Sequence, residues 1–165
     1  MAICRSCDLP TSGKSSYCAT HKAEARAAWK ARISEESEAR EARKAEHSAL
    51  WQKACEAASK AWHDAAPKAM IVTDDLTGQE WHVSEGVCGF ASVIVRPANS
   101  SFAHWLKTNT RTYKNYYGGL AVSSSSLVPE DARSQSYDRK TAAVRAAVEV
   151  LREAGIKAST DSRLD

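Results

Sequence analysis

The sequence predicts an α+β fold: a small turn-rich N-terminal segment, a long helix rich in alanine and charged residues, and a small mixed sheet covered by two helices. Three observations predict this plan. Residues 22–66 contain no glycine or proline, which is typical of a long helix. Residues 90–95 form an apolar, strand-like run, and residues 136–154 repeat apolar side chains at helical spacing. We expect a knuckle at residues 1–21, a long helix or helical linker at 22–67 and a compact domain at 68–165.

The long helix is predicted to have two different parts. Trp51, Ala54, Cys55, Ala58 and Trp62 recur every three or four residues, so they form an apolar stripe that should pack against the rest of the protein. Between residues 32 and 46 only Ile33 and small side chains interrupt the charged ones, which predicts a solvated arm. A dimer through this helix stays open, although no sustained heptad pattern of large apolar residues is present.

The compact domain is predicted from alternating strand and turn signals. Residues 71–72 and 81–83 flank Thr77-Gly78, which indicates a hairpin. A short helix capped by Asn99 or Ser100 should follow the strand at 90–95, and a further strand is expected at 120–122. The helix at 136–154 should end at Gly155, with a last extended piece from residue 156.

Four residues near the N-terminus have the spacing of a metal site. Cys4 and Cys7 are separated by two residues, and so are Cys18 and His21, with ten residues between the two pairs. Thiolates and imidazole are the ligands that Zn²⁺ prefers, and a two-residue spacer lets one turn present two of them. Because four protein ligands leave no position for water, we expect one structural zinc ion rather than a catalytic one.

Positive charge is concentrated at the N-terminus. Residues 1–32 contain six Lys or Arg against two acidic residues, a net charge of +4, whereas residues 69–165 contain eleven of each sign. A second basic stretch lies between Glu85 and Glu130, where acidic residues are absent and cations alternate with aromatic residues. Cations bind phosphates and aromatic rings stack on bases, so we predict nucleic-acid contacts in both places. The candidate contacts are Arg5, Lys14, Lys22, Arg26, Lys30 and Arg32, then Lys107, Arg111, Lys114, Tyr113, Tyr116 and Tyr117. The alternative for the second group is that its aromatic residues are core and its cations are merely solvated.

Residues 4–33 resemble the zinc knuckle at the start of many phage-type HNH endonucleases. That pattern also runs Cys-x2-Cys, a proline, a Ser/Gly loop, Tyr-Cys-x2-His and then a basic helix. The paired histidines and asparagine of the HNH signature are absent, so nuclease activity is not carried over. The remainder of the chain, from Cys88-Gly89-Phe90 to the final Ser162-Arg163-Leu164-Asp165, resembles uncharacterised small bacteriophage proteins.

Three functions follow as hypotheses. The first is a non-enzymatic DNA- or RNA-binding protein. The second is an adaptor or inhibitor that binds a host protein through the long helix. The third is a metal-dependent nuclease, for which Asp74, Asp75, Glu80, His82 and Glu85 form the one acidic cluster that could hold a catalytic metal. These residues surround the expected hairpin turn, and aspartate favours such turns for structural reasons. No apolar run is long enough to span a membrane or to act as a signal peptide, so we expect a cytoplasmic protein, in the host cytoplasm if phage-encoded.

Overall fold

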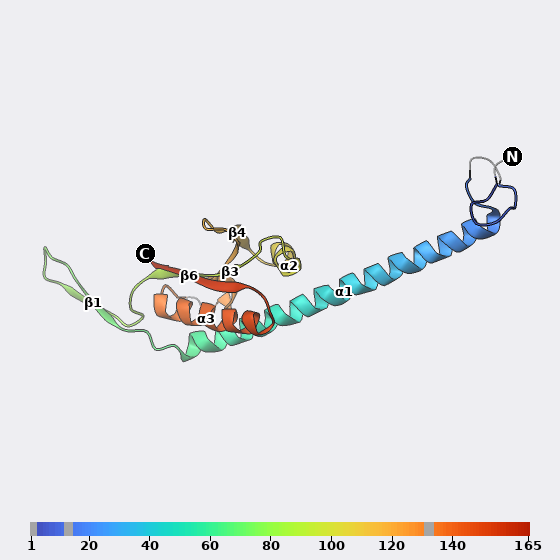
Figure 1. Cartoon of the computed structure of the whole chain (residues 1–165). Coiled ribbons are helices and arrows are strands. Elements are labelled where there is room, and N and C mark those ends of the chain that lie inside the picture. The colour runs from blue at the N-terminus through green and yellow to red at the C-terminus, as the bar shows by residue number, and fades with distance from the viewer. Residues whose placement is uncertain (1–2, 12–14, 131–133) are drawn as a thin grey trace. The chain divides into compact units, whose positions relative to one another are not determined.

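The computed structural model describes residues 3–11, 15–130 and 134–165 (Figure 1). The chain divides into two compact units, residues 1–45 and residues 46–165. The predicted α+β fold class, with a knuckle, a long helix and a sheet with helices, is confirmed. No helix formed by the described residues combines the length and the apolar character that crossing a bilayer requires.

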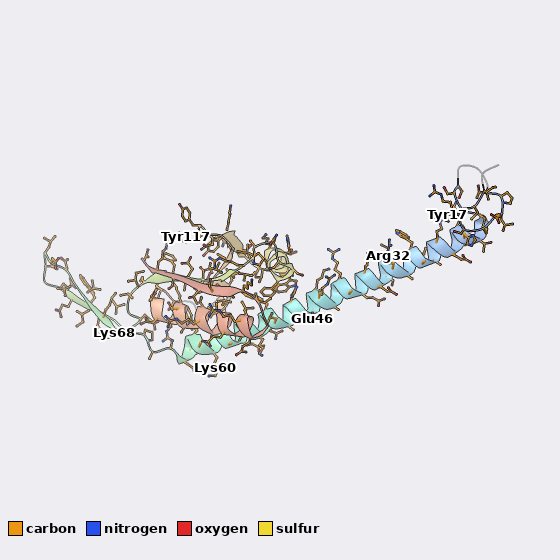
Figure 2. All side chains as sticks on the ribbon, in the orientation of Figure 1. Tyr17, Arg32, Glu46, Lys60, Lys68 and Tyr117 are labelled. Carbon is orange, nitrogen blue, oxygen red and sulfur yellow. The ribbon has the colours of Figure 1, made fainter. Side chains whose placement is uncertain are left out.

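The N-terminal unit consists of the knuckle and the first part of helix α1 (Ala19–Asp64). A single bridge joins Ile3 to Pro10, and the Cys4 amide donates to the Leu9 carbonyl at 3.1 Å. The Arg5 amide donates to the Ser16 carbonyl at 3.0 Å, which brings the second cysteine-containing turn beside the first. From residue 22 to residue 46 every side chain of α1 is exposed, as the charged composition predicts (Figure 2).

The last part of α1 belongs to the C-terminal unit. Trp51, Ala54, Ala58 and Trp62 are buried, and Cys55 packs against the same core. These are the residues of the predicted apolar stripe. The compact unit therefore begins at residue 46, because the stripe completes its core.

A two-stranded antiparallel sheet follows α1. It contains β1 (Met70–Thr73) and β2 (Glu80–Val83), with Ile71 opposite His82. The predicted hairpin is thus present, and Gly78 adopts the positive φ of 68° that its turn requires.

The main sheet has four antiparallel strands in the order β4-β5-β3-β6. The elements are β3 (Gly89–Val95), α2 (Ser101–Asn109), β4 (Thr112–Lys114), β5 (Leu120–Ser123), the 3₁₀ turn η1 (Ser124–Ser126), α3 (Tyr137–Glu153) and β6 (Ala158–Leu164). Along the chain these elements run β3-α2-β4-β5-α3-β6, and in the sheet β5 lies between β3 and β4. This is the split β-α-β arrangement of ferredoxin-like domains.

The helices form where their caps and apolar faces predict. Ser100 caps α2 by accepting a hydrogen bond from the Ala103 amide, and Ser136 caps α3 in the same way through the Arg139 amide. The inward faces that the sequence predicts are buried and join the apolar side of the main sheet in one core. The core residues of the two helices are Phe102, Ala103, Leu106, Ala143, Val144, Ala147, Val148 and Leu151.

Arg139 links three segments of the C-terminal unit. Its guanidinium binds the Glu85 carboxylate at 2.9 Å and donates to the carbonyl of Trp62, in the last turn of α1, at 2.9 Å. The guanidinium lowers the pKa of Glu85 below its ordinary value. This contact explains why the end of α1, the turn before β3 and the start of α3 stay together.

Candidate metal centre and nucleic-acid interface

The four predicted ligands converge in the knuckle. Cys4 and Cys7 lie on the first turn, Cys18 immediately precedes α1, and His21 lies in the first turn of that helix. Their ligand atoms all lie within 4.8 Å of one another. Among the residues that the structure describes, this is the only group of three or more Cys, His, Asp or Glu side chains close enough to hold a metal ion.

The spacing of these atoms fits a tetrahedral ion. A tetrahedron with metal–sulfur bonds of about 2.3 Å and metal–nitrogen bonds of about 2.0–2.1 Å has S···S edges of about 3.8 Å and S···N edges of about 3.5 Å. The Sγ atoms of Cys7 and Cys18 are 3.7 Å apart. His21 Nδ1 lies 3.4 Å from the Sγ atoms of Cys4 and Cys7 and 3.3 Å from that of Cys18. The four side chains are therefore consistent with one structural metal site, with Nδ1 as the imidazole ligand.

Backbone hydrogen bonds in the knuckle favour the thiolate form of two of the three cysteines. Burial raises the pKa of Cys4, but hydrogen bonds from the amides of Cys18 and Ser6 outweigh it and bring the pKa down to about 6. The pKa of Cys18 is lowered mainly by the amide of His21. With a pKa of about 6, Cys4 is largely a thiolate near neutral pH, which is the form that binds metal. The pKa of Cys7 is instead raised, because the hydrogen bond from the Leu9 amide is outweighed by burial and by the neighbouring thiols of Cys18 and Cys4.

Glu24 lies behind the histidine ligand. Its Oε2 is 3.9 Å from His21 Nε2, one turn further along α1. A carboxylate beside the second ring nitrogen favours the tautomer in which Nδ1 is free to bind a metal. The sequence analysis did not single out Glu24, although its i+3 spacing from His21 is visible in the sequence.

The basic residues of the N-terminal unit gather on one face of α1. Lys22, Arg26, Trp29 and Ile33 follow one another at four- and three-residue steps, which places them in one row. Lys30 lies one turn after Arg26. Trp29 and Ile33 are large apolar residues, yet they are 56% and 43% exposed. We call this row, with Lys30, the basic face.

The cations of the basic face are not neutralised locally. In the part of the chain that the structure describes, no carboxylate lies within ion-pair distance of Lys22, Arg26 or Lys30. Arg32 differs, because it pairs with Glu36 at 3.7 Å. Arg5 is exposed in the knuckle, and Lys14 lies outside the described residues.

The second predicted group is divided among different elements. Lys107 lies on α2, and its ammonium donates to the carbonyl of Ala98 at 2.8 Å. Arg111 is exposed just after that helix. Tyr113 and Lys114 lie on β4, whereas Tyr116 and Tyr117 lie in the turn between β4 and β5 with 92% and 81% exposure. Figure 2 shows Tyr117 projecting from this turn. The two tyrosine rings of the turn meet edge to face at 5.1 Å. These aromatic residues are therefore surface residues rather than core.

The acidic cluster of the β1–β2 hairpin has structural partners. The Asp74 carboxylate accepts hydrogen bonds from the amides of Leu76 and Thr77, and these bonds lower its pKa. Glu85 pairs with Arg139. Both carboxylates thus stabilise local backbone and side-chain arrangements.

No protein-family model matches this chain, and no curated protein or solved structure is significantly similar to it. The functional argument therefore rests on the chain's own geometry.

Proposed function

We propose that this chain is a zinc-binding, non-enzymatic protein that binds nucleic acid through the basic face of α1. Zinc is the ion that three thiolates and one imidazole at tetrahedral spacing suit best. Four protein ligands close the coordination sphere, so the ion holds the knuckle in place against the first turn of α1 and supplies no chemistry to a substrate.

The single observation that carries the nucleic-acid proposal is the unpaired charge of the basic face. A zinc ion with three thiolates carries one net negative charge, so residues 1–32 keep a net charge of +3 when the ion is bound. Cations without acidic neighbours attract phosphates and release counterions on binding. Trp29 and Ile33, in the same row, offer apolar contacts to sugars or bases.

The resemblance to the phage-type knuckle supports the same proposal, since a basic helix follows the zinc ligands there as it does here. On the same resemblance, the proposal includes that the protein is encoded by a phage and acts in the host cytoplasm. DNA and RNA are both candidate ligands.

The test is a double charge reversal, Arg26→Glu with Lys30→Glu, in the zinc-loaded protein. We expect weaker binding to DNA and RNA in gel-shift titrations and a flatter salt dependence, with the log–log slope reduced by about 0.7–0.9 for each lost phosphate contact. Lys53→Glu with Arg145→Glu is the matched control, because it makes the same charge change at exposed positions of the C-terminal unit. Equal losses in the two variants, or no binding by the wild-type protein at micromolar concentration, would refute the proposal.

An adaptor function is the second candidate, and the exposed Trp29 and Ile33 favour it. Large apolar residues one turn apart on an exposed helix are also what a groove on a partner protein, or a second copy of this helix, accommodates. The two candidates differ in salt response: phosphate binding weakens steeply between 50 and 200 mM salt, whereas an apolar helix interface does not. Trp29→Ala should abolish a salt-insensitive complex with a host protein while only weakening a nucleic-acid complex.

A metal-dependent nuclease is the least supported candidate, because among the described residues the acidic side chains around the β1–β2 hairpin do not come close enough together to hold an ion. It predicts cleavage of DNA or RNA that requires an added divalent cation and that is lost in Asp74→Asn or Asp75→Asn. Incubation of labelled single- and double-stranded substrates with Mg²⁺ or Mn²⁺ tests it directly.

A further inference from the structure

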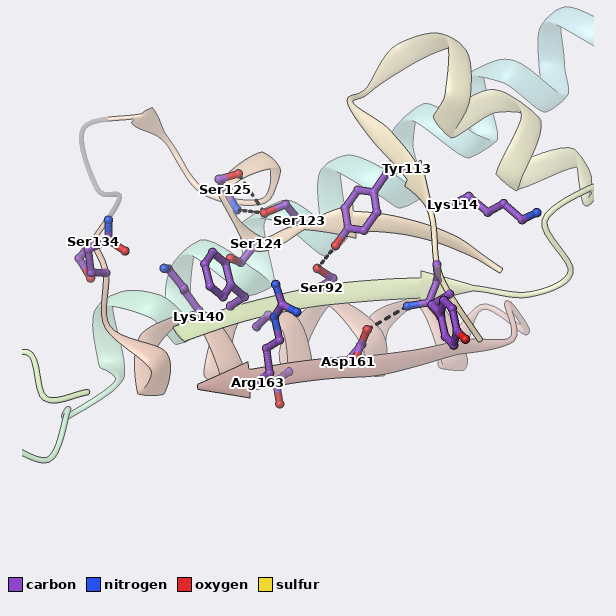
Figure 3. Close-up of a pocket in the computed structure, with 16 residues that line it drawn as sticks. Ser92, Tyr113, Lys114, Ser123, Ser124, Ser125, Ser134, Lys140, Asp161 and Arg163 are labelled. Carbon is purple, nitrogen blue, oxygen red and sulfur yellow. Dashed lines mark hydrogen bonds between the residues drawn. The ribbon is translucent and has the colours of Figure 1, made fainter. Parts of the chain in front are cut away.

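The main sheet has one face covered by helices and one that carries a pocket. On β3, Ala91, Val93 and Val95 belong to the core. Because side chains alternate along a strand, Phe90 and Ser92 point to the opposite face. A pocket of about 710 Å³ lies on that face, with small hydroxyl-bearing side chains along its floor and walls (Figure 3). A volume of this size is in the range of ligand-binding clefts.

One end of the pocket is positively charged. The register of β3 and β6 places Arg163 opposite Phe90, and α3 brings Lys140 to the same ring. The Lys140 ammonium lies 5.6 Å and the Arg163 guanidinium 5.1 Å from the centre of the Phe90 ring. Within the described chain, no carboxylate lies at ion-pair distance from either cation. Lys140 also donates to the Gly89 carbonyl at 2.6 Å, and the charge of Asp165 acts on its ammonium. Arg163 is therefore the cation at this end that is best placed to accept an anionic group.

The other end of the pocket is formed by the β4–β5 hairpin. The Tyr113 hydroxyl is hydrogen-bonded to Ser92 Oγ at 2.5 Å, which fixes the tyrosine ring against the sheet. Lys114 and Tyr116 complete this end, and Tyr116 is almost fully exposed. Asp161, the one carboxylate in the lining, is bound by Asn115 Nδ2 at 2.9 Å, so anions are expected at the end with Arg163 and Lys140 rather than beside it.

The length of the pocket distinguishes the ligands that it can hold. Lys114 pairs with Leu120, and Leu120 pairs with Val95, which is five residues along β3 from Phe90. At about 3.3 Å per residue the two ends are separated by about 16 Å along the strand direction. A single nucleotide does not bridge cationic and aromatic groups so far apart, whereas a strand of several nucleotides does.

We infer that this open face of the main sheet, the sheet-face site, binds a single-stranded segment of nucleic acid. Phosphates bind Arg163 and Lys140 beside Phe90 at one end, and an unpaired base stacks on the exposed ring of Tyr116 at the other. Serine hydroxyls between them accept and donate hydrogen bonds to sugars and phosphates. The inference rests on the proposed function for the class of ligand, but its residues belong to the C-terminal unit and exclude the basic face.

The test compares Arg163→Glu with Lys157→Glu in the full-length, zinc-loaded protein. Both reverse one exposed cation, but Lys157 precedes β6 and does not line the sheet-face site. Fluorescence anisotropy is measured at low salt with a labelled twelve-nucleotide single strand of deoxythymidine, the same length of uridine, and a duplex. We expect Arg163→Glu to weaken single-strand binding at least tenfold, Lys157→Glu to leave it within twofold of wild type, and duplex binding to change little.

Tyr116→Ala provides a second variant that does not threaten folding, because the side chain is 92% exposed. Loss of one stacked base should weaken single-strand binding by about 5- to 150-fold. Wild-type binding by both Arg163→Glu and Tyr116→Ala would overturn the sheet-face site, even where the Arg26/Lys30 variant loses binding and the basic-face proposal stands. If the sheet-face variants lose binding while the Arg26/Lys30 variant binds as well as wild type, the result would support the sheet-face site and refute the basic-face proposal.

A competition arm separates a strand from a free nucleotide. Adenosine monophosphate that displaces the labelled strand at equal nucleotide concentration would show that the pocket holds one nucleotide, which overturns the proposal of a strand. We expect no displacement until the mononucleotide is in large excess, because it reaches only one end of the site.

Discussion

Residues 1–45 bury only two side chains among those that the structure describes, and both are cysteine ligands. Residues 46–165 bury a continuous apolar core that joins the end of α1, α2, α3 and the main sheet. Large apolar residues of the first unit, Trp29 among them, remain exposed. The comparison teaches that the first unit has four clustered metal ligands where the second has a hydrophobic core. We propose that metal coordination stabilises the first unit, whereas burial of apolar surface stabilises the second.

The largest expected effect comes from shortening the C-terminal unit at its N-terminal end. A chain of residues 46–165 should fold with a cooperative thermal transition, whereas a chain of residues 69–165 should be unfolded at room temperature. The shorter chain lacks Trp51 and Trp62, and removing a buried tryptophan side chain costs about 3–5 kcal/mol on its own. Circular dichroism melts of the two chains decide the matter; equal melting temperatures would show that α1 contributes nothing to the core.

The complementary test removes the metal site. Cys7→Ser should abolish binding of the one expected zinc ion and unfold the knuckle, while the melting temperature of the C-terminal unit stays unchanged. Metal analysis and hydrogen exchange of the knuckle amides measure the two effects. Cys88→Ser is the matched control, because Cys88 is an exposed cysteine outside the site and should leave one ion per chain. Wild-type protein that purifies with no metal and with freely titrating N-terminal thiols would contradict the metal-centred account.

A smaller effect is expected where polar contacts hold the second unit together. Arg139→Ala should lower its free energy of unfolding by about 1–3 kcal/mol, because the carboxylate of Glu85 and the carbonyl of Trp62 lose their donor. Arg152→Ala is a suitable control, since Arg152 makes only a local bond from its guanidinium to the carbonyl of Ala158. Urea unfolding of both variants gives the comparison.

Acidification tests the same contact independently. The pKa of Glu85 is depressed in the folded protein, so its contribution to stability is complete above the ordinary value of 4.5 and is lost as the pH falls through the depressed value. Glu85 is partly exposed, so the effect is small. The Arg139→Ala variant should show less of this acid sensitivity than the wild-type protein; an unchanged pH profile would mean that the ion pair does not stabilise the fold.

The smallest expected effect concerns the group behind the metal ligand. Glu24→Gln should weaken zinc affinity by less than about tenfold, because its carboxylate orients His21 from 3.9 Å without binding the ion. Competition with a chromogenic chelator measures the change. A loss as large as that of Cys7→Ser would imply that Glu24 is itself a ligand.

The sequence predicts best where chemistry is local. Cysteine and histidine spacing locates all four ligands, and three- and four-residue periodicity locates the buried faces of α1 and α3. The edge strand β4 is not predicted, because three residues, Thr-Tyr-Lys, carry no alternating pattern. The sheet-face site is also not predicted as a unit: Phe90, Lys140 and Arg163 are far apart in the chain, and only strand register and the docking of α3 bring them together.

The β1–β2 hairpin has a consequence for how the protein opens. Its strands pair only with each other, and Ile71, Val72 and Trp81 are partly or largely exposed while Leu76 is 96% exposed. An isolated two-stranded ribbon is marginally stable in water, so its amides should exchange with solvent through a local opening that requires far less free energy than global unfolding. A protease that accepts apolar residues should make its first cut near Leu76, and the two fragments should stay associated through the intact core.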